Sequence, residues 1–283
     1  MNTAPPMAMS IDVEDWFHVQ NLRAGISRDS WDDRERRVVA NTDRMLEALD
    51  ETGVRCTCFV LGWVADREPD LVRRIAEAGH EIASHGQGHD LVYDLGPDAF
   101  REDVRRAKRT LEDLSGRAVV GYRAPNFSIT DWAIDILREE GHRWDSSSFP
   151  VVAHDRYGRL SGAPAGEDVY PIGDAFHEVC VSSLETLGTR IPWGGGGYFR
   201  LLPYAVFRRG VRSIVSKGRP FVFYIHPWEI DPGQPRVGGL SRSHAFRHYV
   251  NLGRCEGRWR RLLSEFPWTT IGDLLDRGVA AGQ

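Results

Sequence analysis

The sequence contains no long apolar run, since no segment reaches the roughly 18 uninterrupted apolar residues that a membrane-spanning helix requires. The first residues, MNTAPPMAMS, lack the basic start and the apolar core of a secretory signal peptide. We therefore expect a cytoplasmic protein with no transmembrane segment.

Cysteine is scarce, with four residues in 283, which is too few for a disulfide framework. Cys56 and Cys58 lie in an apolar run, so reduced and partly buried thiols are expected there rather than a redox or metal site. The formal net charge of -4 is small and provides no field that would attract nucleic acid or an anionic membrane. Neither is expected as a partner.

Composition and periodicity indicate one globular unit. The chain is 41% hydrophobic and 27% charged, and it has no internal repeat or linker-like tract, so residues 1–283 are expected to form a single domain. Short apolar runs alternate with amphipathic segments, which is typical of a mostly parallel sheet covered by helices. About seven or eight such units favour a barrel over an open sheet. The expected fold class is α/β, a deformed (β/α) barrel with about seven parallel strands.

The same patterns predict the individual elements. Strands are predicted at residues 6–13, 55–61, 81–84, 118–122, near 144, and at 178–181 and 220–225. Helices are predicted at residues 30–50, 69–78, 97–114, 131–140 and 204–215, and a C-terminal helical stretch precedes residues 268–275. In a parallel barrel the reactive side chains gather at the carboxyl ends of the strands, so polar residues there are the candidates for a site.

Three carboxylates crowd the end of the first predicted strand, at Asp12, Glu14 and Asp15. Residues two apart on a strand point to the same side, so Asp12 and Glu14 should share a face. Carboxylates this close resist simultaneous ionisation unless a cation or an arginine lies among them. The cluster therefore indicates a metal site or a general base, and the alternative is a solvated acidic loop that caps a helix.

His85 and His89 follow the third predicted strand, and their spacing of four lets both imidazoles reach one ion if the chain makes a helical turn. Gly86 and Gly88 allow the backbone to bend closely. Two histidines and a carboxylate from another strand end would form a site with open positions, suited to Zn²⁺ or another divalent ion that polarises a carbonyl and activates water. His80 lies at the opposite end of that strand and is interpreted as structural.

Three further polar residues lie at strand ends. Arg123 could orient a carboxylate through a charge-assisted pair, although a surface ion pair is the simpler interpretation. Asp145 could hold the site residues in place without contacting the substrate itself. His226 closes an apolar run, where an imidazole is placed for proton transfer.

Together these motifs resemble those of the polysaccharide deacetylases, the NodB-homology or carbohydrate esterase family 4 group. The shared order is an acidic motif, His-Gly-x-x-His, Arg-x-Pro, Asp-Ser-Ser and an apolar run that ends in histidine, and it covers about residues 8–230. Residues 12–18, 194–200, 226–229 and 246–249 also resemble one bacterial branch, which is associated with exopolysaccharide loci and protein-sorting gene clusters. That branch carries an additional C-terminal segment, here about residues 231–283. The resemblance implies a NodB-like, TIM-barrel-related fold.

The resemblance also implies roles for individual residues. It makes Asp12 the general base, Arg123 the residue that holds this base, and His226 the general acid. It makes His85 and His89 metal ligands, with Zn²⁺ as the first choice of ion and Co²⁺ or Ni²⁺ as alternatives.

One departure from the family concerns the third metal ligand. Val13 occupies the position of a second aspartate in the common pattern, and valine cannot bind a metal. Some relatives use an Asp-x-Asp arrangement, so Glu14 is the first choice of third ligand and Asp15 is the second.

The implied activity is metal-dependent N-deacetylation of an N-acetylated polysaccharide or of its precursor, with release of acetate. Asp12 would take a proton from water, and His226 would protonate the departing amine. The charge of the metal, and a backbone donor either near Tyr122 to Pro125 or in the first acidic motif, would stabilise the oxyanion. The oligo- or polysaccharide would contact Tyr122 and Pro125. It would also lie in a groove walled by aromatic rings, namely Trp16, Phe17, Trp193, Tyr198 and Trp228. Each of these rings singly fits a place in the core equally well.

Two other functions fit the sequence. The chain could hydrolyse another C–N bond, in a small or cyclic amide, as some similar barrels do. It could also be a catalytically inactive barrel that binds glycan, an interpretation that only the altered first motif supports.

Overall fold

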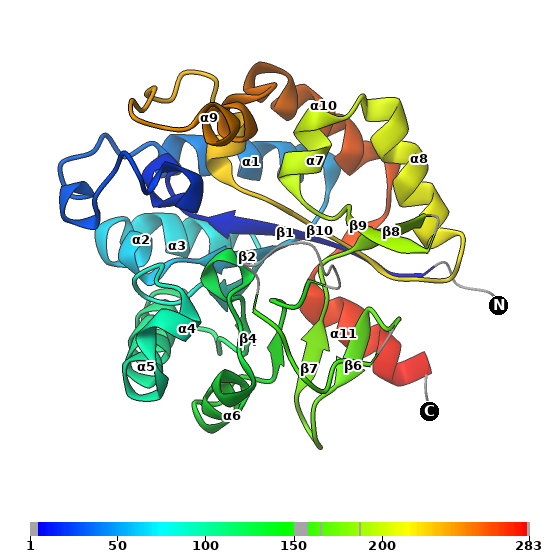
Figure 1. Cartoon of the computed structure of the whole chain (residues 1–283). Coiled ribbons are helices and arrows are strands. Elements are labelled where there is room, and N and C mark those ends of the chain that lie inside the picture. Colours follow the sequence, from blue (N-terminus) through cyan, green and yellow to red (C-terminus); the bar gives the residue numbers. More distant parts are fainter. Residues whose placement is uncertain (1–4, 150–157, 165, 187, 282–283) are drawn as a thin grey trace.

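The chain forms a curled, mostly parallel β-sheet wrapped by helices (Figure 1). The computed structural model describes residues 5–149, 158–164, 166–186 and 188–281. Seven successive strands run parallel; in spatial order they are β10 (Phe221–Ile225), β1 (Met7–Val13), β2 (Thr57–Val60), β3 (Glu81–Ser84), β4 (Gly121–Tyr122), β5 (Trp144–Asp145) and β7 (His177–Val179). The prediction of an α/β fold with a deformed barrel is confirmed, and the sheet is curled into a half-barrel.

Further strands extend this sheet or lie beside it. They are β6 (Val169–Pro171), antiparallel to β7; β11 (Trp268–Thr269), parallel to the start of β1; and the hairpin of β8 (Ser183–Thr186) and β9 (Thr189–Pro192). The residues that flank this hairpin lead the chain to β10. Ser182 N donates to Val222 O over 3.4 Å, and Tyr224 N donates to Gly194 O over 2.7 Å. Isolated hydrogen bonds of this kind, rather than a regular ladder, join the two ends of the curl.

The strands are buried on both sides, as expected for a parallel sheet covered by helices. Met9, Ile11 and Val13 of β1 pack in the large core cluster that includes the outer helices, whereas Ala8 packs inside the curl with residues of β2, β3, β5, β7 and β10. Successive residues of a strand alternate sides, so Asp12 lies on the inner side at the carboxyl end of β1.

The end of the half-barrel opposite Asp12, where the strands begin, is covered by α11 (Ile271–Ala281). Ile271, Leu274 and Leu275 belong to the inner cluster, and β11 just before them pairs with the first residues of β1. The amino ends of the strands are therefore closed by apolar side chains, which leaves the carboxyl ends for a site.

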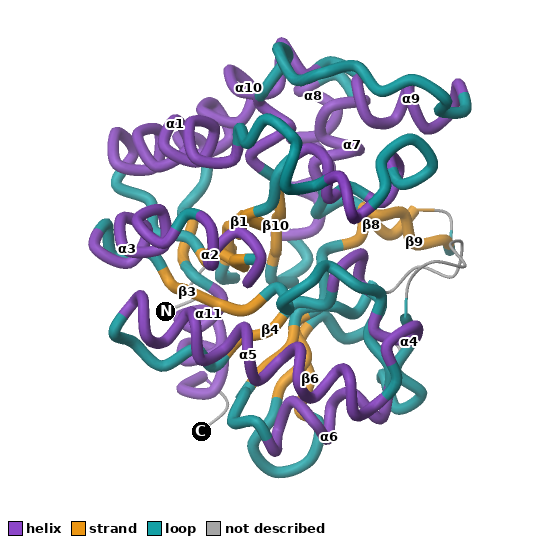
Figure 2. The backbone as a smooth tube through the Cα atoms, turned by 90° about the vertical axis from the view of Figure 1, so that its left-hand side faces the viewer, coloured by secondary structure: helices purple, strands orange, loops and turns teal. Residues whose placement is uncertain are grey.

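The helices lie around the outside of the sheet, as Figure 2 shows. Their bounds are α1 (Val38–Thr52), α2 (Gly62–Arg67), α3 (Pro69–Glu77), α4 (Val92–Leu95), α5 (Pro97–Ser115), α6 (Asp131–Glu139), α7 (Gly196–Leu201), α8 (Tyr204–Val215), α9 (Arg242–Tyr249) and α10 (Leu252–Glu265). Short 3₁₀ helices are η1 (Trp16–His18), η2 (Gln20–Leu22), η3 (Arg28–Ser30), η4 (Pro125–Phe127) and η5 (Pro227–Ile230). The helices predicted at 69–78, 97–114, 131–140 and 204–215 are α3, α5, α6 and α8, and each agrees to within one residue at both ends.

The helix predicted at residues 30–50 is wrong at its start, because α1 begins at Val38. The reason is a contact from a distant part of the chain. Asp15 accepts hydrogen bonds from the backbone N–H groups of Arg37 over 2.7 Å and Val38 over 3.0 Å, so its carboxylate caps the helix. Local sequence signals around residue 30 could not reveal a cap supplied from residue 15.

The C-terminal segment packs on the same core as the first strands. Cys255, Trp259 and Leu262 of α10 lie in one apolar cluster with Met9 and Ile11 of β1. All four cysteines are buried free thiols. Among the described residues, every helix is too short or too polar to span a membrane.

Candidate metal and catalytic site

A cavity of about 450 Å³ lies at the carboxyl ends of the parallel strands. Asp12 and Glu14 reach it from the end of β1, His85 and His89 from the loop after β3, and His226 from the end of β10. The structure thus brings together five residues that the sequence predicted for the site.

Glu14, His85 and His89 form a buried group whose ligand atoms lie within 4.8 Å of one another. His85 Nδ1 lies 2.8 Å from the carbonyl oxygen of Arg123, and a hydrogen bond there directs Nε2 to the cavity. Glu14 Oε2 is buried, and its nearest polar neighbour is His89 Nε2, 2.6 Å away. One carboxylate with two imidazoles is a donor set that Zn²⁺, Co²⁺ and Ni²⁺ accept, so these three residues fit a divalent cation.

The turn between the two imidazoles is held by Asp103 of α5. Its carboxylate accepts hydrogen bonds from the backbone N–H groups of Gln87 over 2.8 Å and Gly88 over 3.0 Å. His89 has a φ of 57°, which is uncommon for a residue other than glycine. This fixed turn, rather than a turn of helix, sets the direction in which both imidazoles point.

Burial and charge give Glu14 and His85 the protonation states that metal coordination needs. Burial alone would raise the pKa of Glu14, but the charges of His89 and His226 outweigh it and hold that pKa well below its usual range. Burial lowers the pKa of His85 to about 4. Near neutral pH the carboxylate is therefore ionised and the imidazole of His85 is neutral, as metal coordination requires.

Asp12 lies beside this group and is held by a buried arginine. Arg123 Nη1 donates to Asp12 Oδ1 over 2.7 Å, and Arg123 is fully buried. The guanidinium also donates to Ser10 Oγ over 2.9 Å and to Ser146 Oγ over 2.8 Å. The interpretation of Arg123 as a surface ion pair is therefore wrong. One oxygen of Asp12 is fixed, and Oδ2 remains for chemistry in the cavity.

His226 faces the two carboxylates of the first motif. Its Nε2 lies 3.8 Å from Asp12 Oδ2 and 3.6 Å from Glu14 Oε1, and its Nδ1 lies 2.8 Å from Glu229 Oε1. Burial alone would lower the pKa of His226, but Glu14 and Glu229 outweigh it and raise the pKa to about 9. The imidazole therefore carries a proton near neutral pH, with Nε2 directed at the cavity.

Sequence reasoning missed two charged residues behind His226. Glu229 also accepts from the backbone N–H of His226 over 3.2 Å, and Arg200 Nε donates to Glu229 Oε2 over 2.6 Å. A Cβ at Gly196 would lie 2.1 Å from Glu229 Oε1, so this approach requires glycine. The run of glycines before Arg200 was the available signal, because it indicates a close approach to the backbone.

Asp15, the second choice of metal ligand, points away from the imidazoles. Its carboxylate accepts hydrogen bonds from the backbone N–H groups of Trp16, Arg37 and Val38, and burial raises its pKa to about 6. The acidic cluster is therefore divided. Asp12 and Glu14 face the cavity, and Asp15 alone has the helix-capping role that was the alternative for the whole cluster.

The residues predicted to contact substrate are divided in the same way. Tyr198 and Trp228 line the cavity, and Trp228 Nε1 also donates to Glu14 Oε1 over 3.2 Å. The cavity lining does not include Trp16, Phe17, Tyr122, Pro125 and Trp193, all of which are buried. Other rings take their place, namely Phe127, Phe149 and Tyr224.

The buried rings have partners within the core. Trp16 Nε1 donates to Glu35 O over 3.1 Å, and Trp193 Nε1 donates to Phe207 O over 3.0 Å. Tyr122 packs edge-on against Phe100, with ring centroids 5.8 Å apart. These side chains stabilise the fold around the cavity and do not reach a ligand in it.

Asp145 lies behind Arg123 rather than in the cavity lining. Its Oδ1 accepts from Ser147 Oγ over 2.6 Å, and Ser147 Oγ accepts from the backbone N–H of Ala124 over 2.7 Å. Asp145 therefore supports the chain next to Arg123. It is also directly in register with Glu178 of β7, so two buried carboxyl groups lie side by side.

We expect Glu178→Gln to stabilise the protein at alkaline pH. Burial raises the pKa of Asp145 to about 6 and the pKa of Glu178 well above its usual range. In the unfolded chain both carboxyl groups have a pKa of about 4. Above that pH the native state therefore binds more protons than the unfolded state does. The free energy of unfolding then falls as the pH rises through the native pKa values. Glutamine keeps the oxygen that accepts from Ser147 and Ser148.

The expected gain in the free energy of unfolding is about 1–2 kcal/mol near pH 8, and it should shrink toward pH 4. Urea denaturation at the two pH values measures the difference. A gain of equal size at both pH values would show that the carboxyl pair does not titrate in this way.

Two family models match the chain in succession. The first, described as polysaccharide deacetylase, covers residues 30–144, and the second, described as domain of unknown function DUF3473, covers residues 146–276. His85, His89 and Arg123 lie in the first region, and Arg200 and His226 lie in the second.

Similar proteins include a peptidoglycan-N-acetylglucosamine deacetylase of Bacillus cereus, 26% identical over 166 residues, which are 53% of this chain and 60% of the relative. The chain spans less than half the length of the next two curated relatives. A structure from Mycobacterium smegmatis, assigned to the polysaccharide deacetylases, has a TM-score of 0.65 and 21% identity and covers 100% of this chain and 93% of its own. A pseudoenzyme of carbohydrate esterase family 4 from Bacillus anthracis has a TM-score of 0.52 and 12% identity, covering 97% of this chain and 66% of its own. These structures share the fold.

Proposed function

Because the chain belongs to the polysaccharide deacetylases, the NodB-homology group of carbohydrate esterase family 4, and continues into a DUF3473 region, we propose that it is a metal-dependent N-deacetylase of an N-acetylated glycan. The observation that carries the proposal is the convergence of three features on one cavity. They are a carboxylate fixed by arginine, a Glu-His-His donor set and a protonated histidine. Each has a separate task in the hydrolysis of an amide.

Asp12 is the proposed general base. A divalent ion held by Glu14, His85 and His89 would polarise the acetamido carbonyl and acidify a water molecule. Asp12 is placed to take the proton of that water through Oδ2, because Arg123 binds Oδ1. Arg123 thus holds the base in one direction from behind the cavity.

His226 is the proposed general acid. Its protonated Nε2 shares the cavity with the base and can donate a proton to the departing amine nitrogen as the C–N bond breaks. The products are acetate and a free amino sugar. Glu229 orients the ring and stabilises its charge, and Arg200 fixes Glu229.

Acetate release from N-acetylglucosamine oligosaccharides, measured together with bound metal, tests the proposal. We expect acetate to form when a divalent ion is bound, to stop after chelation, and to return with Zn²⁺, Co²⁺ or Ni²⁺. Glycan binding by the metal-loaded protein without acetate release would contradict the proposal and would favour an inactive glycan-binding barrel.

Glu229→Gln should move the alkaline limb of the pH profile of kcat/KM to lower pH. His226 donates a proton only while protonated, so activity is present below its pKa of about 9 and is lost as pH rises through that value. Removing the charge of Glu229 lowers that pKa, and we expect a shift of about one pH unit. Glu256→Gln on α10 is the control and should leave the profile unchanged. The same alkaline limb in both variants would argue against His226 as the acid.

A further inference from the structure

One side of the cavity is formed by α9, which lies in the region matched by DUF3473. Phe246 and Arg247 of α9 line the same cavity as Glu14 and His226. We propose that α9 forms a subsite for a neighbouring sugar unit, and that this subsite selects a unit carrying an anionic group, a carboxylate or a phosphate. The inference rests on the proposed function for the glycan nature of the ligand, but its test requires no turnover.

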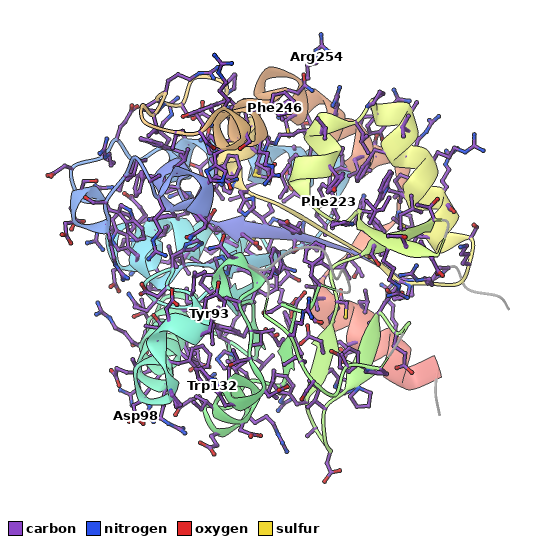
Figure 3. The ribbon with its side chains drawn as sticks, viewed as in Figure 1. Tyr93, Asp98, Trp132, Phe223, Phe246 and Arg254 are labelled. Atoms are coloured by element: carbon purple, nitrogen blue, oxygen red, sulfur yellow. The ribbon has the colours of Figure 1, made fainter. Side chains whose placement is uncertain are left out.

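Phe246 is a large apolar side chain that the fold leaves in solvent. It is 57% exposed, and Leu201 of α7, which lines the same cavity, is 45% exposed. Figure 3 shows Phe246 on α9, on the side of the molecule where the cavity-lining helices gather. Covering such apolar surface is favourable, and the C–H face of a sugar ring packs well on an aromatic ring. Exposed apolar residues beside a few convergent polar groups are typical of a ligand groove.

Arg247 adds a positive charge beside Phe246. The residue is exposed, and no carboxylate in the described part of the chain forms an ion pair with its guanidinium. The three carboxylates that line the cavity already have basic partners, namely Arg123 at Asp12, His89 at Glu14 and Arg200 at Glu229. A guanidinium binds a carboxylate or a phosphate through paired N–H groups. Arg247 is therefore suited to an anionic substituent on the sugar.

Arg200 fixes α9 relative to the reacting groups. Its Nη1 donates to His248 O over 2.7 Å and to Val250 O over 2.9 Å, and its Nη2 donates to Arg247 O over 3.1 Å. The same guanidinium binds Glu229 through Nε. The last turn of α9 and the residue that orients the acid are thus held by one buried side chain. A subsite built on this turn is preorganised, which favours binding because little is left to order.

Binding titrations test the subsite, with Asp12→Asn present in every protein so that no probe is hydrolysed. The probes are chitotetraose, a tetrasaccharide in which N-acetylglucosamine alternates with glucuronic acid, and chitotetraose 1-phosphate. We expect at least one anionic probe to bind about tenfold more tightly than chitotetraose, and the preferred probe identifies the anion. Arg247→Ala should abolish this preference and change the Kd of chitotetraose less than about twofold. Phe246→Ala should weaken all three probes about fivefold.

Matched controls come from exposed residues outside the cavity lining. Arg254 of α10 points away from the molecule in Figure 3, and Tyr93 of α4 is a 43% exposed aromatic. Arg254→Ala and Tyr93→Ala should leave all three Kd values unchanged. Equal binding of the three probes before substitution, or equal losses from Arg247→Ala and Arg254→Ala, would overturn the subsite. An anionic preference in these titrations, together with no acetate release from the metal-loaded protein that keeps Asp12, would retain the subsite and overturn the catalytic proposal.

Discussion

Asparagine in place of Asp12 should lower kcat by about a thousandfold while the metal content stays unchanged. The substitution keeps the size of the side chain, and the amide oxygen of asparagine can still accept from Arg123 Nη1. What it removes is the proton acceptor on the side of His226, where Oδ2 lies 3.8 Å from Nε2. Acetate release at saturating substrate and elemental analysis of the same sample measure the two quantities.

Arg123→Lys is the companion variant. Lysine keeps the positive charge but lacks the planar fork that binds Asp12, Ser10 and Ser146 together. The base should then be less well oriented, and we expect a smaller loss of kcat, about ten- to a hundredfold. Undiminished acetate release from the Asp12→Asn protein would refute the role of Asp12 as base, and loss of metal from it would make Asp12 a ligand.

Glu14→Gln should lower the affinity for a divalent ion by about a hundredfold or more and abolish acetate release. Glutamine has an oxygen at the same reach, which can still accept from Trp228 Nε1. Its amide is neutral, however, and therefore binds Zn²⁺ far more weakly than a carboxylate does. Titration of the metal against a competing chelator measures the affinity directly.

Asp15→Ala is the matched control from the same acidic cluster. It should retain the metal and lower the melting temperature, because the backbone N–H groups of Arg37 and Val38 lose their acceptor. The expected cost is about 1–2 kcal/mol of unfolding free energy. The opposite pattern, with metal lost from Asp15→Ala and kept by Glu14→Gln, would make Asp15 the third ligand.

The centre of the site could be predicted because its residues lie where regular strands end. Val13 is buried in the core cluster, so the period of the strand places its neighbours Asp12 and Glu14 together on the other side. The same geometry accounts for the departure from the family pattern. The chain turns through a hydrogen bond of 3.0 Å from Glu14 N to Asp12 O, and this turn brings a carboxylate to the imidazoles one residue later.

Contacts between distant parts of the chain could not be predicted. Arg200 and Glu229 are 29 residues apart in the sequence, and Asp15 and Arg37 are 22 residues apart. Neither pair lies within one helix or strand, so the periodicity of an element cannot predict the contact. The path of the loops decides both contacts. The prediction that certain aromatic residues contact substrate failed for another reason, because a large ring suits the core and a groove equally well. Trp193 finds a partner for its N–H within the core.

The two matched family regions meet between residues 144 and 146, and β5 (Trp144–Asp145) lies across that border. β5 pairs with β4 on one side and with β7 on the other. A chain divided there would give two fragments with unpaired strand edges, each prone to aggregation, and would separate His85 from His226. Neither region therefore holds the whole site, and both must be present for His85 and His226 to share one cavity.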